Sequence, residues 1–141
     1  MNHTATGIIL IILLTFIIPG TTLAQEANEE EIKSGYPYAS LSEEEIDMGV
    51  MKAGSNGDGT ITLTNLGEPD LLIARIRSSC GLMIPTWPET AISRGDTVSV
   101  RFRYNTSRLG SFERKITIHT NGWQKNLIVT VKGEVIPEEQ L

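Results

Sequence analysis

The sequence alternates most strictly between apolar and polar residues in Thr97-Val98-Ser99-Val100-Arg101-Phe102-Arg103-Tyr104. Val98, Val100 and Phe102 occupy every second position, so they point to one side of an extended chain and the polar residues point to the other. This period of two predicts a β-strand with one buried face and one face in water. The prediction decides the fold, because segments of the same kind recur along most of the chain.

Shorter or less regular segments on both sides carry the same alternation. They are residues 46–50, 60–64, 71–76, 112–119 and a return strand over 123–133. Ile76 is out of step with Leu71 and Ile73, and a β-bulge that shifts the register by one residue would bring all three inward. Asn121-Gly122 predicts a tight hairpin before the last strand, because both residues tolerate positive φ.

About seven such segments, spaced roughly ten residues apart with turn residues between them, predict an all-β fold made of two facing antiparallel sheets. The lack of a helical period after residue 24 argues against helical enzymes and doubly wound folds. We expect residues 46–50 to form an edge strand on which Ile46, Met48 and Val50 share a face. Its acidic residues would then hinder edge-to-edge pairing.

The first residues predict an export signal. Residues 8–18 are almost entirely apolar, Pro19-Gly20 breaks the run, and small residues precede a cleavage site after Ala24. The run is shorter than the about 20 residues that cross a membrane as a helix. An uncleaved membrane anchor is the alternative, because no Lys or Arg precedes the run. We predict that residues 1–24 are a signal peptide and that the mature chain is periplasmic or extracellular.

The rest of the chain divides by composition. Residues 25–40 predict an acidic flexible linker, residues 41–136 hold the predicted strands, and residues 137–141 form a polar tail. The formal net charge of −5 argues against nucleic acid as a partner, because its phosphates require a basic face. We expect the partner to be an envelope protein or a polysaccharide, with membrane contact only through an uncleaved leader.

Several short motifs resemble, in order, a bacterial family of exported immunoglobulin-like domains of unknown function, DUF1573. They are Ile46-Asp47-Met48-Gly49-Val50, Thr62-Leu63-Thr64-Asn65-Leu66-Gly67, Leu71-Leu72-Ile73, Ser79-Cys80-Gly81, Pro85, Trp87-Pro88, Gly95-Asp96, Gly110-Ser111-Phe112 and Lys132-Gly133-Glu134-Val135. The resemblance spans about residues 46 to 135. It implies a single immunoglobulin-like antiparallel β-sandwich, akin to PapD-type pilus chaperones and major-sperm-protein-like modules, in envelopes of the Bacteroidetes type. It implies no activity.

The sequence departs from the family pattern in the central loop. The resemblance implies Ser-Cys-Gly-Cys-Thr there, whereas Leu82 stands at the second cysteine and Met83 at the threonine. Whatever a cysteine pair does in relatives, this chain cannot do it. Cys80 is its only cysteine, so no internal disulfide can form.

Cys80 is still the sharpest single candidate site. A reactive thiol needs basic neighbours that stabilise the thiolate, and Arg75 or Arg77 on the preceding strand would supply them. We favour the interpretation that Cys80 is a small apolar residue buried beneath the loop. An intermolecular disulfide is a third possibility, because an exported chain with one cysteine leaves it unpaired.

The remaining candidates are aromatic and basic. Trp87 and Trp123 would be exposed anchors for a partner or caps over an open end of the sandwich. Arg101 and Arg103, together with Arg75, Arg77 and Arg114, occupy positions that we read as outward-facing. Neighbouring strands would join them into a basic patch for an anionic polysaccharide or an acidic peptide. Cross-strand pairing with acids such as Glu113 is the reading we favour.

No pattern in the sequence indicates an enzyme, a cofactor or a metal centre. Hydrolase and nucleotide-binding motifs are absent, His3 lies in the leader, and His119 has no ligand at metal-binding spacing. Residues 55–59 resemble a calcium loop faintly, and a tight turn fits them better. We predict a non-enzymatic binding or structural module that uses a strand edge or the loop end with Cys80 and Trp87. A thiol-dependent redox or metal-responsive role of Cys80 is the alternative.

Overall fold

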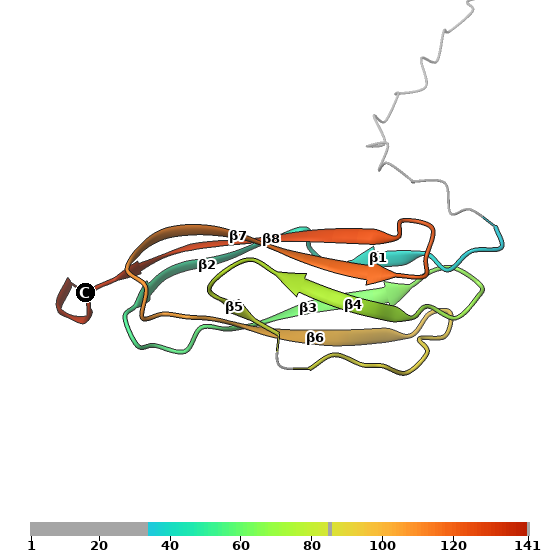
Figure 1. The fold of residues 1–141 in the computed structure, drawn as a ribbon, viewed down its shortest axis with the longest axis horizontal. Coiled ribbons are helices and arrows are strands. Elements are labelled where there is room, and N and C mark those ends of the chain that lie inside the picture. The colour runs from blue at the N-terminus through green and yellow to red at the C-terminus, as the bar shows by residue number, and fades with distance from the viewer. Residues whose placement is uncertain (1–33, 85, 141) are drawn as a thin grey trace, which may run out of the picture.

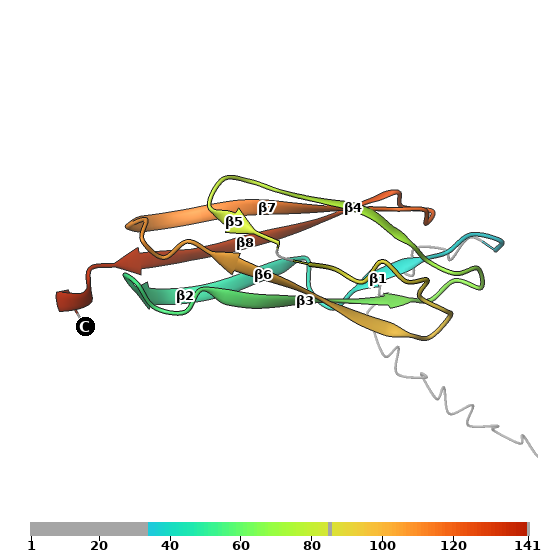
Figure 2. The same cartoon turned by 60° about the horizontal axis from the view of Figure 1, so that its bottom comes forward.

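The protein is a sandwich of two four-stranded β-sheets, as the alternation predicts. The structure is a computed structural model, and it describes residues 34–84 and 86–140. One sheet, which we call sheet A, has the strand order β1-β3-β6-β5; the other, sheet B, has the order β2-β8-β7-β4. Figures 1 and 2 show the two layers from two directions. The predicted signal peptide and residues 25–33 of the predicted linker lie outside the described residues.

Two of the eight strands are too short for alternation to reveal them. The elements are β1 (Ala39–Leu41), β2 (Glu45–Lys52), β3 (Asp58–Asn65), β4 (Ile73–Ser78), β5 (Leu82–Met83), β6 (Thr97–Tyr104), β7 (Gly110–Thr120), β8 (Asn126–Ile136) and a 3-10 helix (Glu138–Gln140). β1 begins inside the segment predicted as linker, and β5 lies inside the predicted central loop. Within the described ranges, no helix is long and apolar enough to cross a membrane.

The strands pair antiparallel with one exception. β2 runs parallel to β8, whereas the sequence predicts antiparallel sheets throughout. Parallel neighbours need a long connection, and the five strands between β2 and β8 provide it. β7 and β8 form the longest ladder, with pairing from Gly110–Val135 to His119–Asn126.

The core lies between the sheets and is filled by the residues that the alternation assigns to the inner faces. The fully buried members are Ile61, Leu63, Leu71, Val100, Phe102, Ile116, Ile118, Val129, Val131 and Val135. Tyr104 on β6 stacks on Phe112 on β7 with ring centroids 3.7 Å apart, which joins the two sheets at one end. Residues 97–104 therefore behave as the sequence predicts.

β-bulges adjust the register on both edges of sheet B. In β4, Ile73 pairs with Thr120 and Arg75 with His119, so the register shifts between them. This shift confirms the predicted bulge, because Ile73 and Ile76 are both buried. A bulge in β2 was not predicted; it turns Val50 outward and Met51 toward the core, so the expectation for Val50 is wrong.

The hairpin predicted before the last strand forms, because β7 and β8 pair antiparallel, but Asn121-Gly122 is not its two-residue turn. β7 ends at Thr120 and β8 begins at Asn126, and the residue with positive φ in this connection is Lys125. The connection is shaped by its neighbours: Asn121 Oδ1 accepts the Leu72 N–H at 2.8 Å. A Cβ atom on Gly122 would lie 3.0 Å from the Pro37 carbonyl oxygen. Tertiary contacts thus override the local turn preference.

Two isoleucines on the paired strands β7 and β8 give a matched test of this arrangement. Ile118 is fully buried, whereas Ile128 lies on the outer face of sheet B and is 53% exposed. We expect Ile118→Ala to lower the free energy of unfolding by about 2–5 kcal/mol, because it leaves a cavity in the core. Ile128→Ala should cost less than about 0.5 kcal/mol. Urea unfolding measures both, and equal losses would contradict the assigned faces.

Candidate functional site

The sandwich has four edge strands, and each edge exposes backbone groups unless something covers them. β1 and β5 border sheet A, and β2 and β4 border sheet B. An open edge offers unpaired N–H and C=O groups to any extended chain that approaches. Such an edge is also a common docking site for a partner peptide. Whether the backbone groups of each edge are covered or exposed therefore indicates where a partner strand could bind.

The β1 edge is covered by a side chain. The Gln124 amide accepts the Ala39 N–H through Oε1 at 3.3 Å and donates through Nε2 to the Ala39 carbonyl oxygen at 3.2 Å. One side-chain amide thus replaces the residue of a neighbouring strand. Because β1 has three residues and Ser40 faces β3, this contact satisfies the outward-facing groups of Ala39 and leaves only those of Leu41.

Two other edges are poor templates for strand addition. β2 carries Glu45 and Asp47, and Asp47 Oδ1 accepts the Gly49 N–H at 2.8 Å inside the bulge. Gly49 has φ of +67°, so the backbone leaves the extended path there. Charges and a bulge are the usual devices that protect an edge. β5 has two residues, Leu82 and Met83, and offers little length for pairing.

The β4 edge is different, because its hydrogen-bonding groups point outward over several residues. The Ser79 N–H donates to the Lys115 carbonyl oxygen at 3.0 Å, and this bond fixes the phase of the β4–β7 ladder. In antiparallel pairs, residues alternate between facing the partner and facing away. Arg77 therefore faces β7, whereas the backbone groups of Ile76 and Ser78 face the open side.

The chain itself uses the start of this edge. Leu71 and Ile92 form an antiparallel bridge, with N–H to O distances of 2.9 Å and 2.8 Å. Within residues 34–84 and 86–140, no backbone hydrogen bond reaches the outward side of Ile76 or Ser78. The bridge shows that an extended segment fits against the edge, and the remainder of the edge is open.

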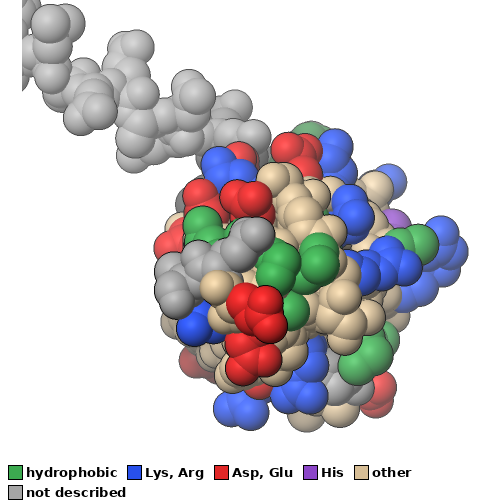
Figure 3. Space-filling view, turned by 90° about the vertical axis from the view of Figure 1, so that its left-hand side faces the viewer, with side chains coloured by type: hydrophobic (Ala, Val, Ile, Leu, Met, Phe, Trp, Pro, Cys, Tyr) green, Lys and Arg blue, Asp and Glu red, His purple; other side chains and the backbone are tan. Residues whose placement is uncertain are grey.

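The open edge is basic, although the chain as a whole is acidic. Arg75 and Arg77 on β4 and Lys115 on β7 are exposed on the outer face of sheet B. In the described part of the chain, the ion pairs are Arg94–Glu68, Arg103–Asp58 and Lys132–Glu45. Arg75, Arg77 and Lys115 are in none of them and therefore have no acidic partner there. In Figure 3, Lys and Arg side chains gather on the right, which is the front of Figure 1 where β4 lies.

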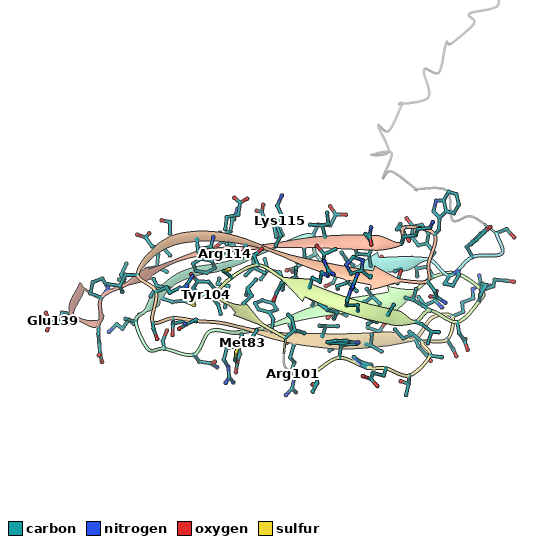
Figure 4. All side chains as sticks on the ribbon, viewed as in Figure 1. Met83, Arg101, Tyr104, Arg114, Lys115 and Glu139 are labelled. Carbon is teal, nitrogen blue, oxygen red and sulfur yellow. The ribbon has the colours of Figure 1, made fainter. Side chains whose placement is uncertain are left out.

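Cys80 lies just beyond β4 and is exposed, so the favoured reading of a buried cysteine is wrong. Its carbonyl oxygen accepts a hydrogen bond from Arg114 Nε at 3.0 Å. Arg114 shares the inward face of β7 with Phe112 and Ile116, contrary to the outward face predicted for it. Because β4 ends at Ser78, the inward guanidinium reaches the loop. Figure 4 shows Arg114 beside Lys115 on β7.

The two tryptophans differ in exposure and in position along the chain. Trp87 is partly buried and packs against the core, and β5 separates it from the Cys80 loop. Trp123 is 46% exposed in the β7–β8 connection, with its ring centroid 5.5 Å from that of Tyr36. Pro85, which precedes Trp87, lies outside the described residues. The predicted loop end with Cys80 and Trp87 thus combines an exposed thiol with an indole that is partly used by the core.

The five arginines of the predicted patch are spread over two sheets and the core side of β7. Arg101 and Arg103 lie on the outer face of sheet A, opposite the sheet that carries Arg75 and Arg77. Arg103 pairs with Asp58 across β3 and β6. The hydrogen bond from Arg103 holds the pKa of Asp58 below its usual value. Among the described residues, Arg75 and Arg77 at β4 and Arg101 on sheet A form no ion pair, and of these only the β4 pair lies beside an open edge.

A groove at the end of the sandwich offers little chemistry. It has a volume of about 750 Å³ and is lined by loop residues 54–57, Gly81, Met83, Tyr104 and Arg108, among others. Of the faint calcium motif, residues 55–57 lie in the connection from β2 to β3 and Asp58 begins β3, with Asn56 Oδ1 accepting the Asp58 N–H at 3.0 Å. Across the described residues, no group of three or more His, Cys, Asp or Glu side chains is placed to hold a metal.

The family described as "Protein of unknown function (DUF1573)" matches residues 39–135, which cover β1 to β8. The chain belongs to this family. The DUF1573 match extends the resemblance seen in the sequence to β1. A comparison with curated proteins found no match.

Solved structures share the fold of this DUF1573 domain. A protein of unknown function from Porphyromonas gingivalis W83 is 20% identical with a TM-score of 0.60; the match covers 76% of this chain and 51% of that one, so our chain spans about half its length. PapD-like domain 7 of human CEP192 has 11% identity, a TM-score of 0.62 and coverages of 76% and 91%. The CsuC-CsuE complex of Acinetobacter baumannii, a chaperone with a tip adhesion subunit, has 11% identity, a TM-score of 0.50 and coverages of 70% and 57%. At these identities, the likeness shows the immunoglobulin-like fold alone.

The sequence identifies Arg75 and Arg77 as candidate binding residues, but it does not show that they lie beside an open strand edge. Their outward positions follow from the alternation of residues 71–76. The pairing partner of β4, the end of that strand and the Gln124 contact on β1 depend on residues far away in the DUF1573 chain. No local signal reports them.

Amide hydrogen exchange tests the assigned phase of β4. We expect the amides of Arg77 and Ser79 to exchange slowly, because both are bonded to β7. The amide of Ser78, which faces the open edge, should exchange much faster. NMR of the described domain resolves these neighbours. Equal protection of Ser78 and Arg77 would mean that this edge is covered.

Proposed function

We propose that this DUF1573 protein is an exported, non-enzymatic module of the bacterial envelope that binds a partner protein by strand addition to β4. The observation that carries the proposal is the outward-facing backbone of Ile76 and Ser78 on an otherwise ordered strand. A partner segment in extended conformation would pair with these groups, as peptides do in other edge-binding domains.

The contrast among the edges supports this location. β1 is covered by Gln124, β2 is interrupted by the bulge at Gly49, and β5 is two residues long. Proteins protect edges in these ways against unwanted pairing. β4 keeps an open and regular stretch beyond the Leu71–Ile92 bridge, so it is the edge best suited to accept a strand.

Export is supported by the sequence of the leader. The apolar run over residues 8–18, the break at Pro19-Gly20 and the small residues before Ala24 fit a signal peptide. A folded module that leaves the cell meets other envelope proteins. One structural relative pairs a chaperone with an adhesion subunit, which illustrates partner binding by a sandwich of this fold.

A thiol-dependent role is the second candidate, and the exposure of Cys80 favours it. In this role, Cys80 would form an intermolecular disulfide or a redox-sensitive contact beside the same edge. The two roles are separable, because strand addition needs the backbone of β4 and not the sulfur atom. Cys80→Ser should leave peptide binding unchanged under the main proposal.

Substitutions at Ser78 test strand addition with a matched control. Ser78→Pro removes the outward-facing N–H but leaves the ladder bonds of Arg77 and Ser79 in place. Ser78→Ala removes only the hydroxyl, which donates to the Leu82 carbonyl oxygen at 3.0 Å. Peptides are first selected on the immobilised domain from a random display library. We expect Ser78→Pro to weaken their binding about tenfold or more, and Ser78→Ala to bind like the wild type.

Thermal unfolding of both variants provides the control for folding. Loss of binding in Ser78→Pro with retained cooperative unfolding supports the edge. Binding that is unaffected by Ser78→Pro but lost in Cys80→Ser would favour the thiol-dependent role. A library that yields no binding peptide would contradict the proposed function.

A further inference from the structure

The cations beside the open edge define what kind of peptide it accepts. We infer that the β4 edge selects an acidic extended segment with carboxylates at every second position, facing Arg75 and Arg77. This inference rests on the proposed function and adds the chemistry of the partner. The edge would then recognise the charge of the partner segment as well as its backbone.

The spacing follows from the geometry of strands. Arg75 and Arg77 are two residues apart and both lie on the outer face of sheet B. In an added strand, every second side chain points to that same face. Neighbouring strands lie about 4.8 Å apart, so acidic residues at those positions come within reach of the two guanidinium groups.

The cations are available for such pairing. Arg75, Arg77 and Lys115 are exposed and have no acidic partner among residues 34–84 and 86–140. Arg114 adds a guanidinium beyond the end of β4, held by the carbonyl oxygens of Cys80 and Glu113 at 3.0 Å and 2.8 Å. In contrast, Arg103 on the other sheet is already paired with Asp58.

The same charges disfavour pairing between two copies through their β4 edges. Two edges related by symmetry would bring Arg75 and Arg77 of one copy against those of the other, and like charges across strands are destabilising. A segment of opposite charge removes this repulsion. The edge is thus suited to an acidic segment and unsuited to its own β4.

A peptide satisfies the edge better than an anionic polysaccharide does. The outward N–H and C=O groups of Ile76 and Ser78 require alternating acceptors and donors at strand spacing. A polypeptide backbone presents that pattern, and a carboxylated sugar chain does not. Polysaccharide binding would depend on the arginines alone and would be insensitive to changes in the β4 backbone.

Fluorescence anisotropy with designed peptides on the mature chain tests the inference. The probe is a short labelled peptide in which Glu alternates with Thr, and the controls replace Glu with Gln or with Lys. A further control carries N-methyl groups on the amides that would face β4. We expect the Glu peptide to bind at least about tenfold more tightly than each control, with affinity falling as salt rises.

Charge-reversal variants locate the effect. Arg75→Glu combined with Arg77→Glu should weaken binding of the Glu peptide at least about tenfold. Lys52→Glu combined with Arg101→Glu changes the net charge equally, on β2 and on the outer face of sheet A, and should have little effect. Circular dichroism confirms that both variants are folded.

The remaining outcomes separate this inference from the proposed function. Library peptides that need the Ser78 N–H but show no preference for acidic residues would overturn the inference and leave strand addition standing. Two results would indicate simple adsorption of anions and would overturn both the inference and the proposed function. One is equal binding of the acidic peptide after N-methylation. The other is displacement of the peptide by polygalacturonate together with unchanged binding to Ser78→Pro. Binding of a peptide copied from residues 25–33 would support the acidic preference, because that segment is rich in Glu.

Discussion

The constraint on which this structure depends is that each strand has one apolar face to bury. Residues such as Ile61, Val100, Ile118 and Val129 can leave water only if two sheets face each other. Two open sheets have four edges, and every edge carries backbone groups that a neighbour, a side chain or water must satisfy. The binding surface we propose is therefore a consequence of how the core is built.

The four edges receive different treatments, and the differences are physically interpretable. A side-chain amide pairs with β1, a bulge interrupts β2, and β5 is kept to two residues. β4 is regular beyond its own bulge, and its outward groups lie beside cations that form no ion pair within the part of the chain that the structure describes. A cationic edge resists association with itself and still attracts an acidic strand. Selective binding and protection against aggregation thus arise from the same side chains.

Much of the fold could be predicted from the sequence, because alternation is a local property. The inner faces of β3, β6, β7 and β8 and the bulge in β4 follow from residues close to one another along the chain. Asn121-Gly122 does not form the two-residue turn that its residue types favour, because its loop is fixed by contacts with Pro37 and Leu72. The charge of Arg114 suggested an outward face, whereas its alternation with Phe112 and Ile116 puts it inward, where it reaches the Cys80 carbonyl oxygen just beyond the end of β4. Edges, exposure and ion pairing depend on distant partners, so the candidate site became visible only in the structure.

The central claim is that a bound peptide continues sheet B beside β4. NMR of the isotope-labelled domain with an unlabelled acidic peptide measures this most directly, through cross-strand proton contacts between the two chains. The account predicts contacts from the peptide backbone to the Ile76 and Ser78 amides, with Arg75 and Arg77 side chains close to the peptide carboxylates. Contacts confined to the Trp123 loop, or to the groove near Tyr104 and Arg108, would contradict it.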